Sequence, residues 1–225
     1  MLPLDRQNRY RQRRRQVQPD WRSSGDEFEA LTRERLSPSS RVLDLGCGRG
    51  EWLEVLAEHG YRSCGIDLNR VMVEEAKERG FDAVEADALS YLRSLSDGSV
   101  AAITSMHLVE HLPYETLIRL LDESLRVLRA GGLLFLETPN PENLTVGACW
   151  FYMDPSHRNP IPPALLQWLV GDRGFNQVEI QRLSENRGVP ELEKVADDVP
   201  GAQQINQLIG MVTAPPDYAV VAIKP

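Results

Sequence analysis

Two of the four histidines in this chain lie in one short segment, HLVEH, at residues 107–111, where an apolar run ends. If the chain turns helically there, His107, Glu110 and His111 occupy positions i, i+3 and i+4 and share one face. Two imidazoles and a carboxylate on one face can hold a divalent metal ion, and a single imidazole can serve as a general base. The same side chains can also be structural, and the segment alone leaves all three possibilities open.

A glycine-rich loop, GCGRG, directly follows the apolar run RVLDL. Glycines permit tight turns and a close approach of the backbone to a ligand, and the helix that follows offers free N–H groups. The glycines stand at positions 46, 48 and 50, whereas a dinucleotide fingerprint would place the third at 51, where Glu51 stands. A carboxylate facing a pyrophosphate is unfavourable. The loop therefore favours a nucleoside with a cationic centre and no phosphates over a nicotinamide dinucleotide.

Charge is distributed unevenly along the chain. Residues 1–22 hold seven arginines and two aspartates, a balance of +5, whereas the other residues hold 18 basic and 31 acidic side chains, a balance of −13. We interpret residues 1–24 as a basic extension that is either solvated or docks on a partner or an acidic surface, and residues 25–225 as one domain. The acidic domain lacks the basic face that nucleic acid requires, so nucleic-acid binding is not expected.

Cysteine usage and hydropathy favour a cytoplasmic protein. Cys47, Cys64 and Cys149 form an odd, scattered set without C-x-x-C spacing, which is typical of a reducing compartment. No apolar run approaches the roughly 18 residues of a membrane span, and no signal-peptide pattern opens the sequence. We therefore expect a cytoplasmic location and no transmembrane segment.

Strand-like and helix-like segments alternate along the chain. Short apolar runs predict strands, and segments of 3.6-residue periodicity with Asn caps and glycine stops predict helices. The alternation predicts an α/β fold, a Rossmann-like three-layer sandwich with a mostly parallel seven-stranded sheet and an antiparallel hairpin of the last two strands at one edge. The expected strands are 41–46, 63–67, 82–87, 99–106, 132–138, 177–183 and 218–225, and the expected helices are 25–36, 51–60, 69–80, 114–128 and 164–175, with a further helix within 184–216.

In such sheets, ligands bind beyond the carboxyl ends of the strands. The stretch that follows the fifth expected strand, TPNPENLTVGACWFYMDPSHRNPIPP, is rich in Pro and Asn and contains three consecutive aromatic residues. It is too long for a simple connector. We therefore expect residues 138–163 to form a lid over the acceptor.

The segment VLDLGCGRGEWL, followed by GIDLN and EADAL, resembles the cofactor half of the class I S-adenosylmethionine-dependent methyltransferases, over about residues 40–140. The resemblance implies S-adenosylmethionine as the cofactor. Asp67 would accept both ribose hydroxyls, as a carboxylate with two acceptor oxygens can. Leu68 would pack on adenine, and Asp87 with the N–H of Ala88 would bind its edge. The implied cofactor residues are Asp44, Gly46, Gly48, Gly50, Asp67, Leu68, Asp87, Ala88 and Met106.

The segments RSSGDEFEALTRERL, DGSVAAITSMHLVEHLP and LETPNPENLTVGACWFYMDPSHRNPIPP resemble bacterial methyltransferases of polysaccharide and O-antigen biosynthesis, which are often fused to glycosyltransferases. This closer resemblance implies a saccharide acceptor and a glycosyltransferase as partner or fused domain. In the lid, Asn140 and Asn143 would hydrogen-bond sugar hydroxyls, and Tyr152 would stack on the sugar. Asp154 would orient His157 or form a turn.

The H-x-x-E-H spacing resembles the E-x-x-E-H metal motif of ubiquinone-type and small-RNA 2′-O-methyltransferases, in which a later histidine completes the site. The implied ligands are His107, Glu110, His111 and His157. Histidine in place of the first glutamate makes Mn, Zn, Fe or Ni more plausible than Mg. In a site without metal, His111 or His157, with Glu110 beside it, would deprotonate a hydroxyl that is a poor nucleophile at neutral pH.

The expected function is methyl transfer from S-adenosylmethionine to a saccharide hydroxyl, with or without a metal. The first alternative is O-methylation of a small molecule such as a quinone precursor. Two other classes stay open at this point, namely a nicotinamide-dependent oxidoreductase and a cofactor-binding scaffold whose arginine-rich segment recruits a partner.

Overall fold

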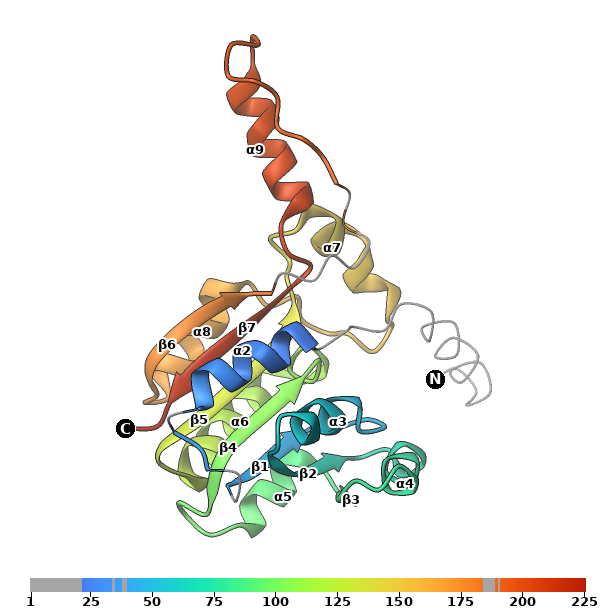
Figure 1. The fold of residues 1–225 in the computed structure, drawn as a ribbon, viewed down its shortest axis with the longest axis vertical. Coiled ribbons are helices and arrows are strands. Elements are labelled where there is room, and N and C mark those ends of the chain that lie inside the picture. The colour runs from blue at the N-terminus through green and yellow to red at the C-terminus, as the bar shows by residue number, and fades with distance from the viewer. Residues whose placement is uncertain (1–21, 34, 38–39, 184–188, 190) are drawn as a thin grey trace.

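Figure 1 shows the computed structural model of the chain, which describes residues 22–33, 35–37, 40–183, 189 and 191–225. Most of the expected basic extension lies outside the described residues. In chain order the described elements are α2 (Arg22–Thr32), β1 (Arg41–Leu45), α3 (Glu51–Glu58), β2 (Arg62–Asp67), α4 (Arg70–Glu78), β3 (Ala83–Glu85), α5 (Ala88–Ser94), β4 (Val100–Met106), the 3₁₀ turn η1 (Val109–His111), α6 (Tyr114–Val127), β5 (Leu128–Pro139), α7 (Leu144–Ala148), the 3₁₀ turn η2 (Trp150–Met153), α8 (Pro163–Asp172), β6 (Asn176–Arg182), α9 (Ala202–Thr213) and β7 (Asp217–Ile223).

The sheet has the strand order β3-β2-β1-β4-β5-β7-β6. The strands from β3 to β5 are parallel, and β7 runs antiparallel to both β5 and β6. The expected seven-stranded sheet with an antiparallel edge pair is therefore confirmed. The strand order reverses between β1 and β4, and the crevice at such a switch point, beyond the carboxyl ends of the strands, is where open α/β sheets bind ligands.

Two apolar cores lie on opposite faces of the sheet, as a three-layer sandwich requires. One core packs α5, α6 and α8 against the sheet, and the other packs α2, α3 and α4 against the opposite face. In the second core Trp52 of α3 stacks on Phe135 of β5, with ring centroids 6.2 Å apart. Phe28 of α2 is fully buried and packs edge-on against both rings. The helix that follows the arginine-rich segment is therefore an integral part of the core.

Several boundaries differ from the sequence expectation. The first described helix covers residues 22–32 instead of 25–36, so Pro38 does not end it. The sequence reading missed α5, which the Asp87 side chain caps by accepting a hydrogen bond from the N–H of Ser90. The fifth strand begins at Leu128, before the Gly131-Gly132 turn.

Among the described helices, none is long and apolar enough to cross a membrane.

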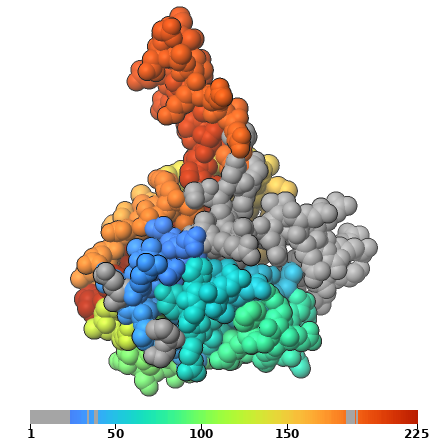
Figure 2. Space-filling view, viewed as in Figure 1, coloured from blue at the N-terminus to red at the C-terminus, as the bar shows by residue number. Residues whose placement is uncertain are grey.

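The connection between β6 and β7 projects away from the sheet. Figures 1 and 2 show α9 and the segment before it standing out from the body as a narrow hairpin. We call residues 191–216 the arm. The expected helix within 184–216 is confirmed as α9.

Candidate active site

The glycine loop between β1 and α3 is held against the end of β2. The N–H groups of Gly46 and Cys47 both donate to the carbonyl of Ile66, at 2.7 and 3.1 Å. The N–H of Gly48 donates to Oδ2 of Asp67 at 3.0 Å. Gly48 and Gly50 have φ values of 55° and 83°, in the left-handed region that favours glycine. Local sequence thus fixes the loop at the ligand edge of the sheet, as expected.

Asp67 and Leu68 lie side by side at the end of β2. Oδ1 of Asp67 accepts a second backbone hydrogen bond, from the N–H of Asn69 at 2.7 Å, so two amides fix the carboxylate. Leu68 is 72% exposed, an unusual position for a leucine beside an ordered turn. A fixed acceptor next to an uncovered apolar side chain suits a ribose with an attached base.

Asp44 of β1 provides the strongest test of the cofactor expectation. The side chain is buried, and the hydroxyl of Thr104 donates to Oδ1 at 2.9 Å. Oδ2 has no hydrogen-bond partner among the described residues. Burial raises the pKa of this carboxyl to about 7, against the opposing effect of the Thr104 bond. A buried acceptor without a donor fits a cationic amino group, such as that of the methionine portion of S-adenosylmethionine.

Asp87, Ala88 and Met106 occupy the remaining expected cofactor positions. Asp87 is the cap of α5, and its Oδ1 also accepts the Ser90 hydroxyl at 2.8 Å. Ala88 opens that helix. Met106 ends β4 and is 5% exposed, within the core that also holds Trp52. In the structure Asp87 and Ala88 therefore begin α5 and Met106 packs in the core, and their expected roles in cofactor binding stay predictions.

The HLVEH segment begins with an unusual backbone turn. His107 has a φ of 56°, and its N–H donates to the carbonyl of Glu137 on the neighbouring strand. Its Nδ1 lies 3.1 Å from Oε1 of Glu110, and its Nε2 lies 3.4 Å from Oε1 of Glu137 and 3.5 Å from Oδ1 of Asp217. Both ring nitrogens of His107 therefore face carboxylates of three buried acids, an arrangement that favours the protonated over the neutral ring.

Ser24 of α2 extends this network to the helix after the arginine-rich segment. Its hydroxyl donates to Oε2 of Glu137 at 2.8 Å, across 113 residues of sequence. The sequence reading identified neither Ser24 nor Asp217 as part of the site. A chain of polar contacts therefore runs from α2 through Glu137 and His107 to Glu110.

A second group of side chains lies on the other side of the Glu110 carboxylate. It consists of Glu110 itself, His111 and His157. Glu110 is fully buried, its Oε2 accepts the Thr138 hydroxyl at 3.0 Å, and its Oε1 lies 3.9 Å from Nε2 of His157. The rings of His111 and His157 lie 4.7 Å apart. One potential ligand atom from each of the three residues lies within 4.8 Å of the others. The four expected metal ligands therefore do not form one set, because His107 faces Glu137 and Asp217 instead.

Two hydrogen bonds fix which nitrogen each histidine of this group presents. Nδ1 of His157 lies 2.7 Å from the carbonyl of Phe151, which can only accept, so the proton is on Nδ1 and the lone pair is on Nε2. The Ser156 hydroxyl donates to Oδ1 of Asp154 at 2.5 Å, so its oxygen accepts from Nδ1 of His111 at 3.2 Å. Metal-ligating histidines are oriented in this way, through the second ring nitrogen.

The charge states of the group follow from burial and contacts. Burial alone would raise the pKa of Glu110, but the hydrogen bond from His107 and the nearby His107 and His111 rings hold that pKa below its ordinary value. Burial lowers the pKa of His157, and His111 adds to this, against the effect of Glu110. The group therefore combines an ionised carboxylate with a neutral imidazole that presents a lone pair.

The comparisons with known proteins agree with this geometry. A family model described as a methyltransferase domain matches residues 11–180 of the chain. The chain belongs to this methyltransferase family.

Solved structures and curated relatives extend this assignment. The methyltransferase superposes on the crystal structure of a SAM-dependent methyltransferase from Archaeoglobus fulgidus with a TM-score of 0.75 and 32% sequence identity, over 89% of this chain and 94% of that one. A probable S-adenosylmethionine-dependent methyltransferase from Mycolicibacterium smegmatis is 28% identical over 154 residues, which cover 68% of this chain and 58% of the relative. The chain therefore belongs to the SAM-dependent methyltransferases, which supports the expected cofactor class and not the nicotinamide-dependent alternative.

A third relative carries the name of a specific reaction. The ubiquinone biosynthesis O-methyltransferase of Xanthomonas oryzae pv. oryzae is 37% identical over 106 residues, or 45% of this chain and 44% of the relative. The chain thus matches about half the length of these curated relatives. The name of this third relative specifies ubiquinone biosynthesis for that protein.

The side chains of Asn140 and Asn143 are engaged by other parts of the methyltransferase. Both are fully buried. The amide of Asn140 donates to the carbonyl of Pro215, and that of Asn143 donates to the carbonyls of Val212 and Ala214. Their side-chain oxygens accept backbone N–H groups of their own loop. These two asparagines therefore bind the root of the arm to the loop after β5, and we do not retain them as acceptor ligands.

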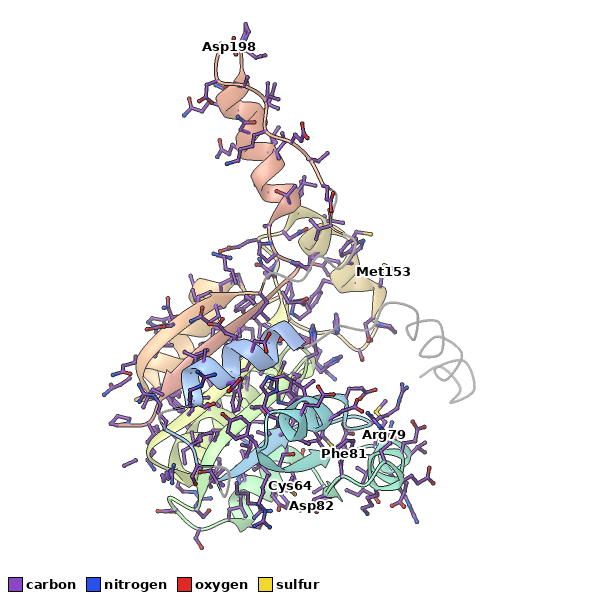
Figure 3. All side chains as sticks on the ribbon, viewed as in Figure 1. Cys64, Arg79, Phe81, Asp82, Met153 and Asp198 are labelled. Carbon is purple, nitrogen blue, oxygen red and sulfur yellow. The ribbon has the colours of Figure 1, made fainter. Side chains whose placement is uncertain are left out.

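The remaining acceptor candidates lie beside the histidine group. Asp154 connects to His111 through Ser156, a residue that the sequence reading missed, and its backbone carbonyl accepts the N–H of His157 at 3.1 Å. Tyr152 is 63% exposed, so its ring is available to an incoming molecule. Figure 3 labels its neighbour Met153, which lies on the same outer turn below the arm.

Proposed function

We propose that this methyltransferase transfers the methyl group of S-adenosylmethionine to a hydroxyl of a small aromatic acceptor, and that Glu110, His111 and His157 activate that hydroxyl. The observation that supports this proposal best is the convergence of these three side chains next to the glycine loop. A Cβ built on Gly46 would lie 3.1 Å from the Cβ of Leu108, so the loop packs directly on the HLVEH segment. The methyl donor and the activating group would therefore share one crevice.

A hydroxyl needs help to take a methyl group from a sulfonium because it is a poor nucleophile at neutral pH. As the O–CH3 bond forms, the S–CH3 bond breaks, the thioether S-adenosylhomocysteine leaves, and the hydroxyl proton passes to the activating group. His157 supports this role with a neutral imidazole whose Nε2 lone pair faces the buried Glu110 carboxylate. Tyr152 and Met153, 63% and 58% exposed, offer an apolar surface beside it for an aromatic ring.

The same three residues fit a divalent cation. Their donor set is two imidazole nitrogens and one carboxylate oxygen, which suits Mn, Zn, Fe or Ni. Three buried carboxylates, those of Glu110, Glu137 and Asp217, lie within 3.5 Å of the His107 ring in this region. In our proposal Glu110, His111 and His157 hold the ion, which would lower the pKa of the acceptor hydroxyl.

The acceptor class rests on the curated relatives. The Xanthomonas enzyme is named for ubiquinone biosynthesis, and its similarity covers 45% of this chain. We therefore place a quinone-type phenol ahead of the saccharide that the closer sequence resemblance implied. A saccharide acceptor with a glycosyltransferase partner remains the second candidate, on that resemblance alone.

The test combines turnover with cofactor and metal binding. Labelled methyl transfer would be measured with a panel of catechol-type phenols and a panel of saccharides, before and after removal of metal with EDTA. Mn²⁺ would be titrated calorimetrically into the stripped protein saturated with S-adenosylhomocysteine. His157→Ala is the test variant, and His59→Ala is the matched control because His59 contacts Val55 and Asp26 away from the crevice.

We expect phenol methylation by the wild type, one Mn²⁺ per chain, and loss of both in His157→Ala. The expected loss of turnover is at least about 100-fold, the lower range for removing an activating group. The His59→Ala control should keep both phenol methylation and the binding of one Mn²⁺ per chain. If His157→Ala binds S-adenosylhomocysteine and turns over like the wild type, the group is structural. Turnover on saccharides but not on phenols would reject the proposed acceptor class.

A further inference from the structure

The exposed apolar surface of the methyltransferase is concentrated on the arm. Of the twelve large hydrophobic side chains that are exposed among the described residues, five lie between positions 192 and 211. Scattered exposed apolar residues are ordinary, whereas a contiguous patch of them indicates an interaction surface. The five residues are Leu192, Val199, Ile205, Leu208 and Met211, with exposed fractions of 49%, 42%, 40%, 58% and 43%.

The helix α9 has two different faces. Asn206 holds one face against the preceding segment, because its amide donates to the carbonyl of Val195 and its oxygen accepts the N–H of Val195, both at 2.8 Å. Ala202 is buried on that same face. Ile205, Leu208 and Met211 follow one another at three-residue intervals on the other side, and they form a stripe that nothing in the described chain covers. Between Ala202 and Thr213 the helix carries no charged residue.

The stripe is symmetric about Leu208. If two copies of α9 pair in antiparallel fashion, Leu208 faces its own counterpart, and Ile205 of each copy faces Met211 of the other. An interface of this kind is isologous and closed, which is the commonest arrangement of soluble homodimers. Antiparallel pairing also opposes the helix dipoles, and the absence of charge on α9 avoids like-charge contacts along the seam.

The charges of the chain support the same arrangement. Residues 191–200 carry four acidic groups and one lysine, a balance of −3, and Figure 3 shows Asp198 at the tip of the arm. In an antiparallel pair, each tip reaches the root of the other arm. The N-terminal end of α2 lies near that root. Ser24 of α2 contacts Glu137. Glu137 and Asp217, at the start of β7, both lie beside Nε2 of His107. In the sequence, the end of α2 is reached through residues 1–22, which have a charge balance of +5.

We propose that the arm is a self-association surface, on which α9 of one copy pairs antiparallel with α9 of a second copy about a two-fold axis at Leu208. A 12-residue helix is about 18 Å long. Such a pair buries less than the roughly 800 Å² per partner of a standard stable interface, so the dimer is weak and concentration-dependent. The acidic segment of the arm would be repelled by an anionic membrane, which favours a second copy over a lipid surface.

Disulfide trapping tests the register of the pair. Cys149 is exposed, so the variants are built on Cys149→Ser. Leu208→Cys should give a covalent dimer under mild oxidation, because the two-fold axis brings that position against itself. Gln203→Cys is the matched control, because this exposed position lies on the same helix but off the stripe. Equal trapping at both positions would reject the proposed register.

Sedimentation velocity tests the association itself, over protein concentrations from about 1 to 200 μM. We expect the wild type to shift from monomer to dimer, and Leu208→Glu to raise the dissociation constant at least about tenfold, because it buries two carboxylates against each other. Trp168→Glu, at an exposed apolar position on α8, should dimerise like the wild type. A wild type that stays monomeric throughout would overturn the proposal. A second outcome would also overturn it, namely a monomeric wild type that co-floats with lipid vesicles while Leu208→Glu does not. The arm would then bind lipid instead of a second copy.

Discussion

Replacing Asp44 by asparagine should stabilise the ligand-free methyltransferase above pH 7 and weaken its binding of S-adenosylhomocysteine. Asp44 is buried, and burial raises its pKa from 3.8 to about 7. A carboxyl with a raised pKa in the folded state holds its proton more tightly when folded than when unfolded. The unfolding free energy of the wild type therefore falls as the pH rises from about 4 towards 7, and it levels off above that.

The magnitude follows from the size of the pKa shift. A shift of about three units corresponds to at most about 4 kcal/mol of lost stability at pH 8. Asparagine avoids this loss and still accepts the Thr104 hydroxyl through Oδ1. Its amide would instead stand where Oδ2 of Asp44 has no partner among the described residues, and a buried amide without an acceptor costs about 1–3 kcal/mol. We therefore expect a net gain of about 1–3 kcal/mol for Asp44→Asn at pH 8.

Binding of the cofactor product should change in the opposite direction. The ionised Oδ2 would accept a charged hydrogen bond from the amino group of the ligand, worth about 1.5–3 kcal/mol. Its loss would weaken S-adenosylhomocysteine binding by about 10- to 150-fold at pH 8. The variant thus separates stability from binding at one residue.

The assay pairs urea unfolding at pH 5 and pH 8 with calorimetric titration of S-adenosylhomocysteine at pH 8. The stability advantage of Asp44→Asn should be larger at pH 8 than at pH 5, because the wild-type carboxyl is still largely protonated at pH 5. Leu43→Val, at a buried neighbour that carries no charge, is the control for disturbance of β1. An advantage that does not depend on pH would refute the reasoning about the carboxyl, and unchanged ligand affinity would refute its role in the cofactor site.

Three further test variants, one of them paired with a control variant, examine other contacts. Ser24→Ala removes the hydrogen bond to Glu137 and should lower kcat several-fold with little change in the KM for S-adenosylmethionine. Thr32→Ala removes a buried hydroxyl from the same helix without touching the site, so an equal loss of kcat in both variants would mean that only the docking of α2 matters. Asn143→Ala removes a helix cap and two hydrogen bonds to the arm root, and it should cost about 3 kcal/mol in urea unfolding; a loss under 1 kcal/mol would contradict the clamp. Gly50→Ala places a Cβ 2.8 Å from a ring carbon at a φ of 83°, and a drop in unfolding free energy of at least about 1 kcal/mol is expected.

Sequence alone predicted the parts of this protein that short-range patterns control. The glycine loop and Asp67 were placed correctly at the ends of adjacent strands, because glycine spacing and apolar runs are local signals. The antiparallel edge formed by β6 and β7 was also expected. Helix α5 was missed, because its seven residues are too few for a clear periodicity and Asp87 was interpreted only as a cofactor ligand.

Tertiary structure decided how the polar side chains are divided among their roles. The spacing of HLVEH placed three side chains on one face, yet His107 lies among Glu137, Asp217 and Glu110, apart from the His111–His157 pair. Asn143 looked like an acceptor ligand but is used to hold the arm. No spacing rule reveals these outcomes, because each depends on which distant segments the sheet brings together.

The contact between Ser24 and Glu137 shows the physical reason most clearly. The two residues are 113 positions apart, and neither has a local pattern that distinguishes it from a surface serine or a strand-end glutamate. Burial of both side chains makes their hydrogen bond obligatory, and burial is a property of the packed sandwich. The sequence by itself determined the fold and the glycine loop, whereas packing determined which side chains meet in the candidate active site.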